Sequence, residues 1–132
     1  MPGSMPIELQ LLVWAVALAV VQIVIAVTGA LLQVGLPTLA GNRDNMPVIT
    51  GWAGRADRAH RNMVYGLALF TALVFVAHAT GRLNPTTALG AELFFWGRLA
   101  YAAVYLIGLP WVRTAAWAVS VVGLVLIFGQ LV

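Results

Sequence analysis

The chain has no cysteine and no lysine, and charged residues make up 8% of its 132 residues. Without cysteine, a disulfide framework, a thiolate zinc site and a cysteine nucleophile are excluded, so any thiol chemistry must use a thiol that a ligand brings. The two histidines, His60 and His78, lie far apart without carboxylates at useful spacing, and no metal site is predicted. Because the seven basic residues are arginines in a hydrophobic chain, their charge indicates membrane topology rather than nucleic-acid binding.

Hydrophobic residues, by contrast, make up 62% of the chain, and the mean hydropathy is +0.97. A soluble domain carries about a quarter charged residues, so this composition predicts an integral membrane protein with one compact domain. The opening residues 1–4, ahead of Met5, resemble a cloning scar. Since a transmembrane helix needs about 20 mostly apolar residues, we predict an all-α, up-down bundle of four transmembrane helices, at about 7–35, 55–80, 85–108 and 110–131.

The arginines are distributed unevenly between the predicted loops. Most lie in or beside the first loop, one lies just after the third, and one, Arg82, lies in the second. The positive-inside rule then places the first and third loops on the cytoplasmic side and both termini outside. The arginines behind this prediction are Arg43, Arg55, Arg58, Arg61 and Arg113.

The second segment opens with a polar series that a membrane helix does not need. At about 100° per residue, Arg58, Asn62 and Tyr65 fall on one face, and Arg55 and Arg61 flank it. We interpret the two flanking arginines as anchors that reach lipid phosphate. Asparagine gains nothing from lipid, so Arg58 and Asn62 are better explained as one wall of a ligand site.

The third segment holds Arg98 too deep for a topology signal, with Tyr101 and Tyr105 on the same helix face. These tyrosines indicate either an aromatic belt or a polar groove between helices. Arg113 starts the fourth segment, where it is either a topology residue or a guanidinium that holds an anion or thiolate.

Several short motifs, taken in order, are similar to those of the MAPEG family, the membrane-associated proteins in eicosanoid and glutathione metabolism. They are "GNRDN", "RADRAHRN", "FVAHATG", "FFWGRLAYAAVYLIGLPWVRT" and "VGLVLIF", and the chain resembles a bacterial-type member. The resemblance implies a homotrimer in the bacterial inner membrane, with glutathione as cosubstrate in a groove between subunits. It also implies a hydrophobic second substrate that arrives from the membrane lipids, either an electrophile or a lipid peroxide.

The resemblance further implies a role for each matching residue. Arg113 matches the arginine that activates the thiol. The implied glutathione contacts are Arg58, His60, Asn62, Tyr65, Tyr101 and Tyr105. The implied supporting residues are Arg98, Asp44 and Thr114.

The sequence departs from the family pattern at two positions. Tyr65 stands where the family has a glutamate, the natural charge partner for Arg98, and Gln33 stands near a position that is basic in vertebrate members. Two functions therefore stay open: a glutathione-dependent transferase or peroxidase, and a non-catalytic membrane interaction or lipid-binding protein. A small transporter is disfavoured, because no pair of carboxylates lies near the membrane midplane.

Overall fold

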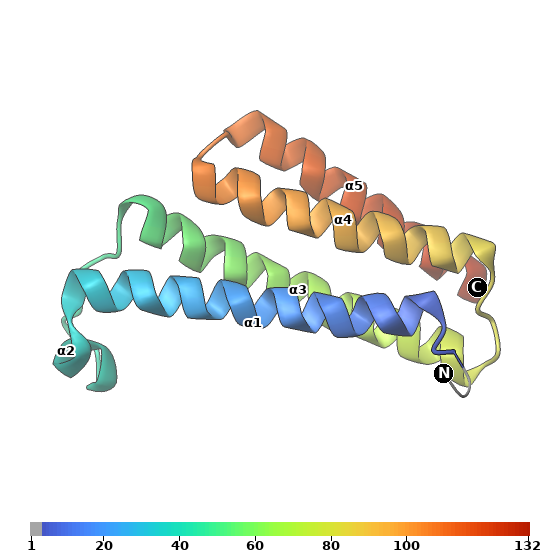
Figure 1. Cartoon of the computed structure of the whole chain (residues 1–132), viewed down its shortest axis with the longest axis horizontal. Helices are drawn as coiled ribbons and strands as arrows, with labels where there is room; N and C mark the ends of the chain where they lie inside the picture. Colours follow the sequence, from blue (N-terminus) through green and yellow to red (C-terminus); the bar gives the residue numbers. More distant parts are fainter. Residues whose placement is uncertain (1–3) are drawn as a thin grey trace.

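A computed structural model of the chain describes residues 4–132, and in this range every regular element is an α-helix. The all-α prediction is therefore confirmed for the described residues. Residues 1–3, which belong to the predicted cloning scar, lie outside them. Four of the helices are long and one is short (Figure 1): α1 (Ile7–Val34), α2 (Leu36–Ala40), α3 (Gly51–Ala79), α4 (Pro85–Ile107) and α5 (Pro110–Leu131).

The region after α1 differs most from the prediction. Gly35, at φ 81°, ends α1 in a conformation that glycine adopts readily, and Pro37 suits the first turn of the unpredicted helix α2. Helix α3 begins at Gly51 rather than near Arg55. The Gln33 carboxamide of α1 explains this early start, because it accepts a hydrogen bond from Thr50 N at 3.0 Å and donates one to Thr50 O at 2.7 Å.

Three helices, α1, α3 and α5, are long and apolar enough to cross a membrane. Helix α4 has 23 residues, a sufficient length, but it contains Glu92 and Arg98. These spans identify an integral membrane protein. Exposed apolar side chains such as Trp14, Leu32 and Phe75 cover the outside of the bundle, and in a membrane this surface faces lipid or other chains rather than water.

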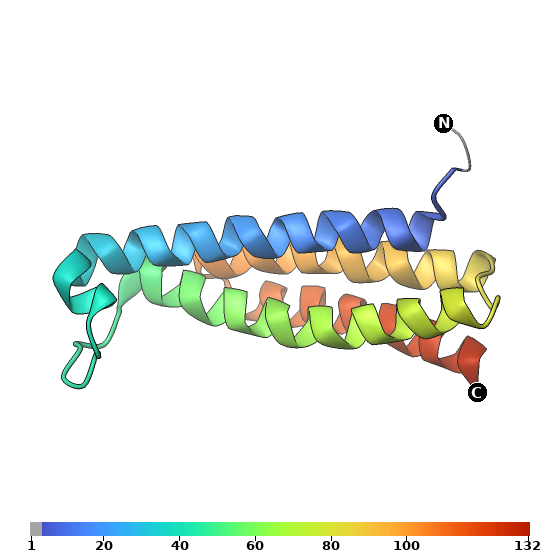
Figure 2. The same cartoon turned by 90° about the horizontal axis from the view of Figure 1, so that it is seen from below.

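The helices pack as two antiparallel pairs, α1 with α3 and α4 with α5 (Figures 1 and 2). The start of α1, the end of α5 and the α3–α4 loop lie at one end of the bundle. Helix α2 and the α4–α5 turn lie at the other end, which we call the arginine end because Arg43, Arg55 and Arg113 are there. In the centre, the rings of Phe70 and Phe94 stack with their centroids 4.2 Å apart.

Polar contacts fix the start of α4 at the end of the bundle opposite the arginine end. Asn84 caps the helix, since its side chain accepts from Thr87 N at 2.9 Å while Thr87 Oγ1 accepts from Asn84 N at 2.8 Å. The Thr87 hydroxyl also lies 2.5 Å from Oε2 of the buried Glu8. The first turns of α1 and α4 are therefore joined by a hydrogen bond between residues 79 positions apart.

Helices α4 and α5 approach so closely that their contact has no room for larger side chains. A Cβ atom on Gly123 would meet the carbonyl oxygen of Gly90 and would lie 2.7 Å from Phe94 N. A Cβ on Gly97 would lie 2.9 Å from Ser120 N. Small residues at such contacts allow helix backbones to approach, and van der Waals packing then stabilises the pair in lipid.

We expect Gly123→Ala to lower the free energy of unfolding by about 1–3 kcal/mol, because the new methyl group overpacks the α4–α5 contact. Gly129 is the matched control on the same helix, since a Cβ there meets nothing within 4 Å. Gly129→Ala should instead stabilise the protein, by up to about 1 kcal/mol, through helix propensity. Reversible unfolding in mixed detergent micelles measures both changes. Equal effects would show that close backbone approach does not stabilise this contact.

Candidate functional site

Six polar or aromatic side chains from α3, α4 and α5 gather towards the arginine end of the bundle. We call this group the arginine–tyrosine cluster. Helix α3 supplies two of its members, α4 supplies three and α5 supplies one, so the cluster ties the two helix pairs together. Its members are Arg58, Asn62, Arg98, Tyr101, Tyr105 and Arg113.

Arg98 forms the buried base of the cluster, with 3% of its surface exposed. Its Nη1 donates a hydrogen bond to Asn62 Oδ1, and its guanidinium lies 5.4 Å from the centroid of the Tyr101 ring. Gly66, one turn after Asn62, makes room for it, because a Cβ there would lie 2.6 Å from Arg98 Nη2. The guanidinium is therefore held between a glycine, a carboxamide and a ring, all of them uncharged.

Tyr105 lies between the two other arginines. Its hydroxyl accepts a hydrogen bond from Arg58 Nε at 3.0 Å, and the Arg113 guanidinium lies 4.4 Å from the centroid of its ring. The Tyr101 ring meets it edge to face, with the centroids 5.4 Å apart. Cation–π contacts of this kind position a guanidinium while leaving its N–H groups available to an anion.

The cluster contains positive charge without a carboxylate. Across residues 4–132, the one ion pair joins Arg61 Nε to Asp57 Oδ2 at 3.0 Å, within α3. The guanidinium groups of Arg58, Arg98 and Arg113 thus have rings, a hydroxyl and a carboxamide as neighbours. Arg98 is buried, Arg113 is half-buried and Arg58 is exposed. Since a buried charge is costly without a counter-charge, this arrangement favours an anionic ligand.

One hollow adjoins the cluster, and its volume is about 190 Å³. Ligand sites for small molecules usually enclose about 300–1,000 Å³. The hollow that one chain forms here is therefore smaller than a usual ligand pocket. The hollow is lined by Asn62, Tyr101, Arg113, Thr114 and Trp117.

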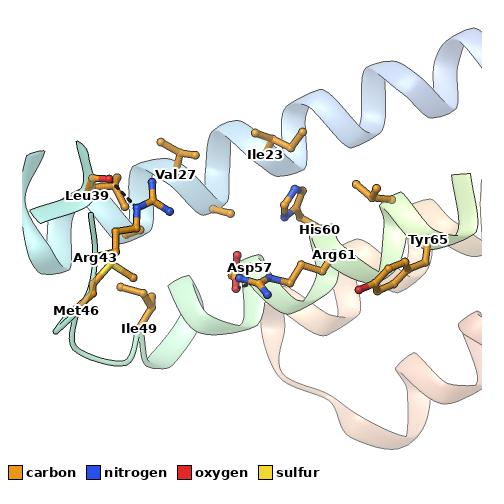
Figure 3. A pocket seen from close by; sticks show the side chains of 13 residues that line it. Ile23, Val27, Leu39, Arg43, Met46, Ile49, Asp57, His60, Arg61 and Tyr65 are labelled. Atoms are coloured by element: carbon orange, nitrogen blue, oxygen red, sulfur yellow. Dashed lines mark hydrogen bonds and ion pairs between the residues drawn. The ribbon is translucent and has the colours of Figure 1, made fainter. Parts of the chain in front are cut away.

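A second hollow of about 480 Å³ lies between α1, α3 and the segment that joins them (Figure 3). We call it the α1–α3 hollow. Its polar wall contains Arg43, Asp57, His60, Arg61 and Tyr65, and its apolar wall includes Ile23 and Val27. The Nδ1 atom of His60 is buried without a hydrogen-bond partner.

The predicted site residues are thus divided between two places. Arg58, Asn62, Tyr101 and Tyr105 come together with Arg98 and Arg113, and Thr114 lines the adjoining hollow. His60 and Tyr65 line the α1–α3 hollow instead. Asp44 is exposed in the segment after α2.

Tyr65, predicted on the same helix face as Arg58 and Asn62, does not join the arginine–tyrosine cluster. Tyr65 is 72% exposed and turns to the edge of the α1–α3 hollow, beside Arg61 (Figure 3). Arg98 therefore lacks Tyr65 as a neighbour and bonds to Asn62.

Arg55, which we interpreted as a lipid anchor, also makes a contact inside the bundle. Its Nε donates to the Leu106 carbonyl at 3.2 Å, where α4 ends before Gly108, which has a φ of 96°. A cation at this position satisfies an open carbonyl and complements the helix dipole. Sequence analysis also missed Gly66 and Trp117. The spacing of Gly66, four residues after Asn62, placed it on the Asn62 face, whereas nothing in the sequence pointed to Trp117.

Comparison with known proteins gives one family. The family model described as the MAPEG family matches residues 11–132, nearly the whole chain. Neither the comparison with curated proteins nor the comparison with solved structures gives a match. The matched range contains both hollows and the whole cluster.

Proposed function

Because the chain belongs to the MAPEG family, whose members generally use glutathione, we propose that it is a membrane enzyme that activates the glutathione thiol. The substrate class is a hydrophobic electrophile or a lipid peroxide. The observation that carries the proposal is the arginine–tyrosine cluster, where three guanidinium groups have no carboxylate partner among residues 4–132.

The donors of the cluster suit glutathione. This tripeptide has two carboxylates, and charge-assisted hydrogen bonds from arginine suit such groups. The glutathione carboxylates would be held by Arg58 and by the hydroxyl groups of Tyr101 and Tyr105. Arg58 already donates a hydrogen bond to Tyr105. Arg98 and Asn62 would keep this wall in position from below. Arg113, above the Tyr105 ring, would face the sulfur.

The chemical step needs a thiolate, which is the nucleophilic form of a thiol. A guanidinium beside the sulfur lowers the cost of releasing the thiol proton to water, and this is the role we give to Arg113. In the transferase reaction the thiolate sulfur bonds to an electrophilic carbon, and the leaving group departs with the bonding electron pair. In the peroxidase reaction the thiolate attacks a peroxide oxygen, the alkoxide that leaves takes a proton, and a second glutathione reduces the sulfenic acid to the disulfide and water.

The small volume beside the cluster supports an assembly in which a second chain completes the site. We propose a homotrimer of four-helix membrane subunits, with α4 as the fourth span. The α1–α3 hollow of a neighbouring chain, with Arg43 and the unpartnered His60, offers a second polar wall. The arginine end would face the cytoplasm and both termini would lie outside.

A second candidate function is a non-catalytic membrane interaction or lipid-binding protein. Tyr65 favours it, because the family glutamate is replaced by a side chain that is exposed at the edge of another hollow. Such a protein would retain the arginine–tyrosine cluster without turnover. Glutathione binding with no turnover of any hydrophobic electrophile or peroxide would support this second function.

The test is a calorimetric titration of the detergent-purified protein with glutathione. We expect saturable binding at millimolar concentration, and a dissociation constant about ten- to hundredfold higher in Arg58→Met, because a hydrogen bond to a charged group is lost. Arg82→Met is the control, since Arg82 donates to the Leu131 carbonyl at the opposite end of the bundle. Absence of binding to the wild-type protein would contradict the proposed glutathione-dependent enzyme.

A further inference from the structure

A long crease runs between α1 and α4, on the side of α4 that faces away from the arginine–tyrosine cluster. At about 100° per residue, Leu99 and Ala103 point roughly opposite to Tyr101 and Tyr105. The crease has two hollows that share Leu99, one of about 190 Å³ and one of about 390 Å³. The first, which we call the deeper hollow because three helices line it, is lined by Leu18, Val21, Gln22, Ile25, Ala56, Ala59, Leu99, Ala102, Ala103 and Leu106.

Gln22 is the one polar residue in the lining of the deeper hollow. It lies near the middle of α1 (Ile7–Val34), it is 7% exposed, and its Oε1 is buried without a hydrogen-bond partner. An unpaired carboxamide in an apolar interior costs free energy, and in the centre of a membrane no bulk water relieves that cost. Every other lining side chain is aliphatic, so the missing partner must come from another molecule.

The second hollow extends the crease towards the start of α1. It lies nearer the start of α1 and is lined on its outer side by Trp14, Glu92 and Trp96. Trp96 Nε1 donates to Glu92 Oε2 at 2.7 Å. The crease therefore continues from the Trp96–Glu92 pair to an apolar floor with a single carboxamide.

We propose that the α1–α4 crease binds a long-chain lipid that carries a hydroxyl group along its chain, with that hydroxyl bonded to Gln22. A hydroxyl group both donates and accepts, so it can pair with Oε1 or with Nε2 whichever way the carboxamide is turned. A charged group at this depth would be far more costly, and a plain alkyl chain would leave Gln22 unpaired. The aliphatic walls suit the remainder of the chain.

This lipid is not the acceptor substrate of the proposed glutathione chemistry. The crease and Arg113 lie on different sides of α4, so a molecule in the crease is separated from the sulfur by the helix itself. The crease is a separate binding site, and it does not depend on whether the cluster binds glutathione.

The test is a competition between two fatty acids. The purified protein is equilibrated with mixed micelles that contain equal amounts of 12-hydroxyoctadecanoic acid and octadecanoic acid, and the bound acids are extracted and quantified. We expect the hydroxy acid to be enriched about three- to tenfold, as one net hydrogen bond provides. The Gln22→Leu variant should bind the two acids equally. Ala103→Phe, which fills the deeper hollow, should bind less of both.

Three outcomes would overturn the proposal. The first is equal binding of the two acids by the wild-type protein, and the second is a preference that persists in Gln22→Leu. The third is a change of oligomeric state in Gln22→Leu, which would show that a second copy of the chain pairs with the carboxamide. Leucine keeps the size and increases the apolar character of the site, so this variant is expected to fold. Glutathione binding, measured in parallel, should be the same in Gln22→Leu and in the wild-type protein.

Discussion

Arg113→Ala is expected to lower the rate of glutathione conjugation about a hundredfold or more, the usual cost of removing one preorganised charge-stabilising donor. The reason is electrostatic, because this guanidinium sits over the Tyr105 ring, 4.4 Å from its centroid, with no ion-pair partner found among residues 4–132. Its charge is thus available to a thiolate. The measurement is steady-state conjugation of glutathione to 1-chloro-2,4-dinitrobenzene, together with the ultraviolet absorbance of the bound thiolate.

The two readouts separate activation of the thiol from binding of the tripeptide. If Arg113 holds the thiolate, its absorbance should disappear in Arg113→Ala, while the dissociation constant for glutathione rises less than the rate falls. Arg82→Ala, at the opposite end of the bundle, should leave both unchanged. A variant that loses binding but keeps the thiolate signal of the remaining complex would assign Arg113 to carboxylate recognition instead.

Helices α1, α3 and α5 were predictable because apolar length alone identifies a membrane segment. Composition does not reveal how a loop folds back on the helices that flank it. The early start of α3 depends on Gln33 binding the backbone of Thr50, a contact between residues 17 positions apart. The short helix α2 likewise depends on the φ of 81° at Gly35, which the sequence permits but does not require.

The part of the candidate site that lies on a single helix was predictable. The spacing of Arg98, Tyr101 and Tyr105 places them on one face of α4, and the structure does bring them together. Tyr65 shows where this reasoning ends. Periodicity gives the direction of a Cα, but the neighbouring helices decide which way a long side chain leans.

The same limit applies to the partner of Arg98. A glutamate was the expected counter-charge, and its absence suggested an unpaired charge. The structure instead pairs the guanidinium with Asn62, beside the space that Gly66 leaves. Asn62 was interpreted as a ligand contact because asparagine gains nothing from lipid and lies on the Arg58 face. Its pairing with Arg98 could not be predicted, because helical spacing relates residues of one helix only.

Asn62→Leu should therefore destabilise the protein by about 1.5–3 kcal/mol, the usual value of a hydrogen bond to a charged group. The substitution leaves the buried Arg98 without the carboxamide that accepts its Nη1 hydrogen, and Arg98 Nε already lacks a partner. The free energy of unfolding in mixed micelles, measured without glutathione at fixed protein concentration, isolates this structural role from any ligand contact.

The double variant Asn62→Leu/Arg98→Met tests the cause. Replacing both members of a buried polar pair by apolar residues is often neutral, whereas removing one member leaves the other unpaired. The free energy of unfolding of the double variant should thus lie within about 1 kcal/mol of the wild-type value. Each single substitution is expected to change this free energy by more than the double substitution does. If the two destabilisations simply add, the Asn62–Arg98 bond does not hold α3 to α4, and the floor of the cluster must be supported by its rings. If the double variant is instead as stable as the wild-type protein, the Asn62–Arg98 pair contributes no net stability. The charge of Arg98 beneath the site is then the property that the Arg98→Met substitution removes.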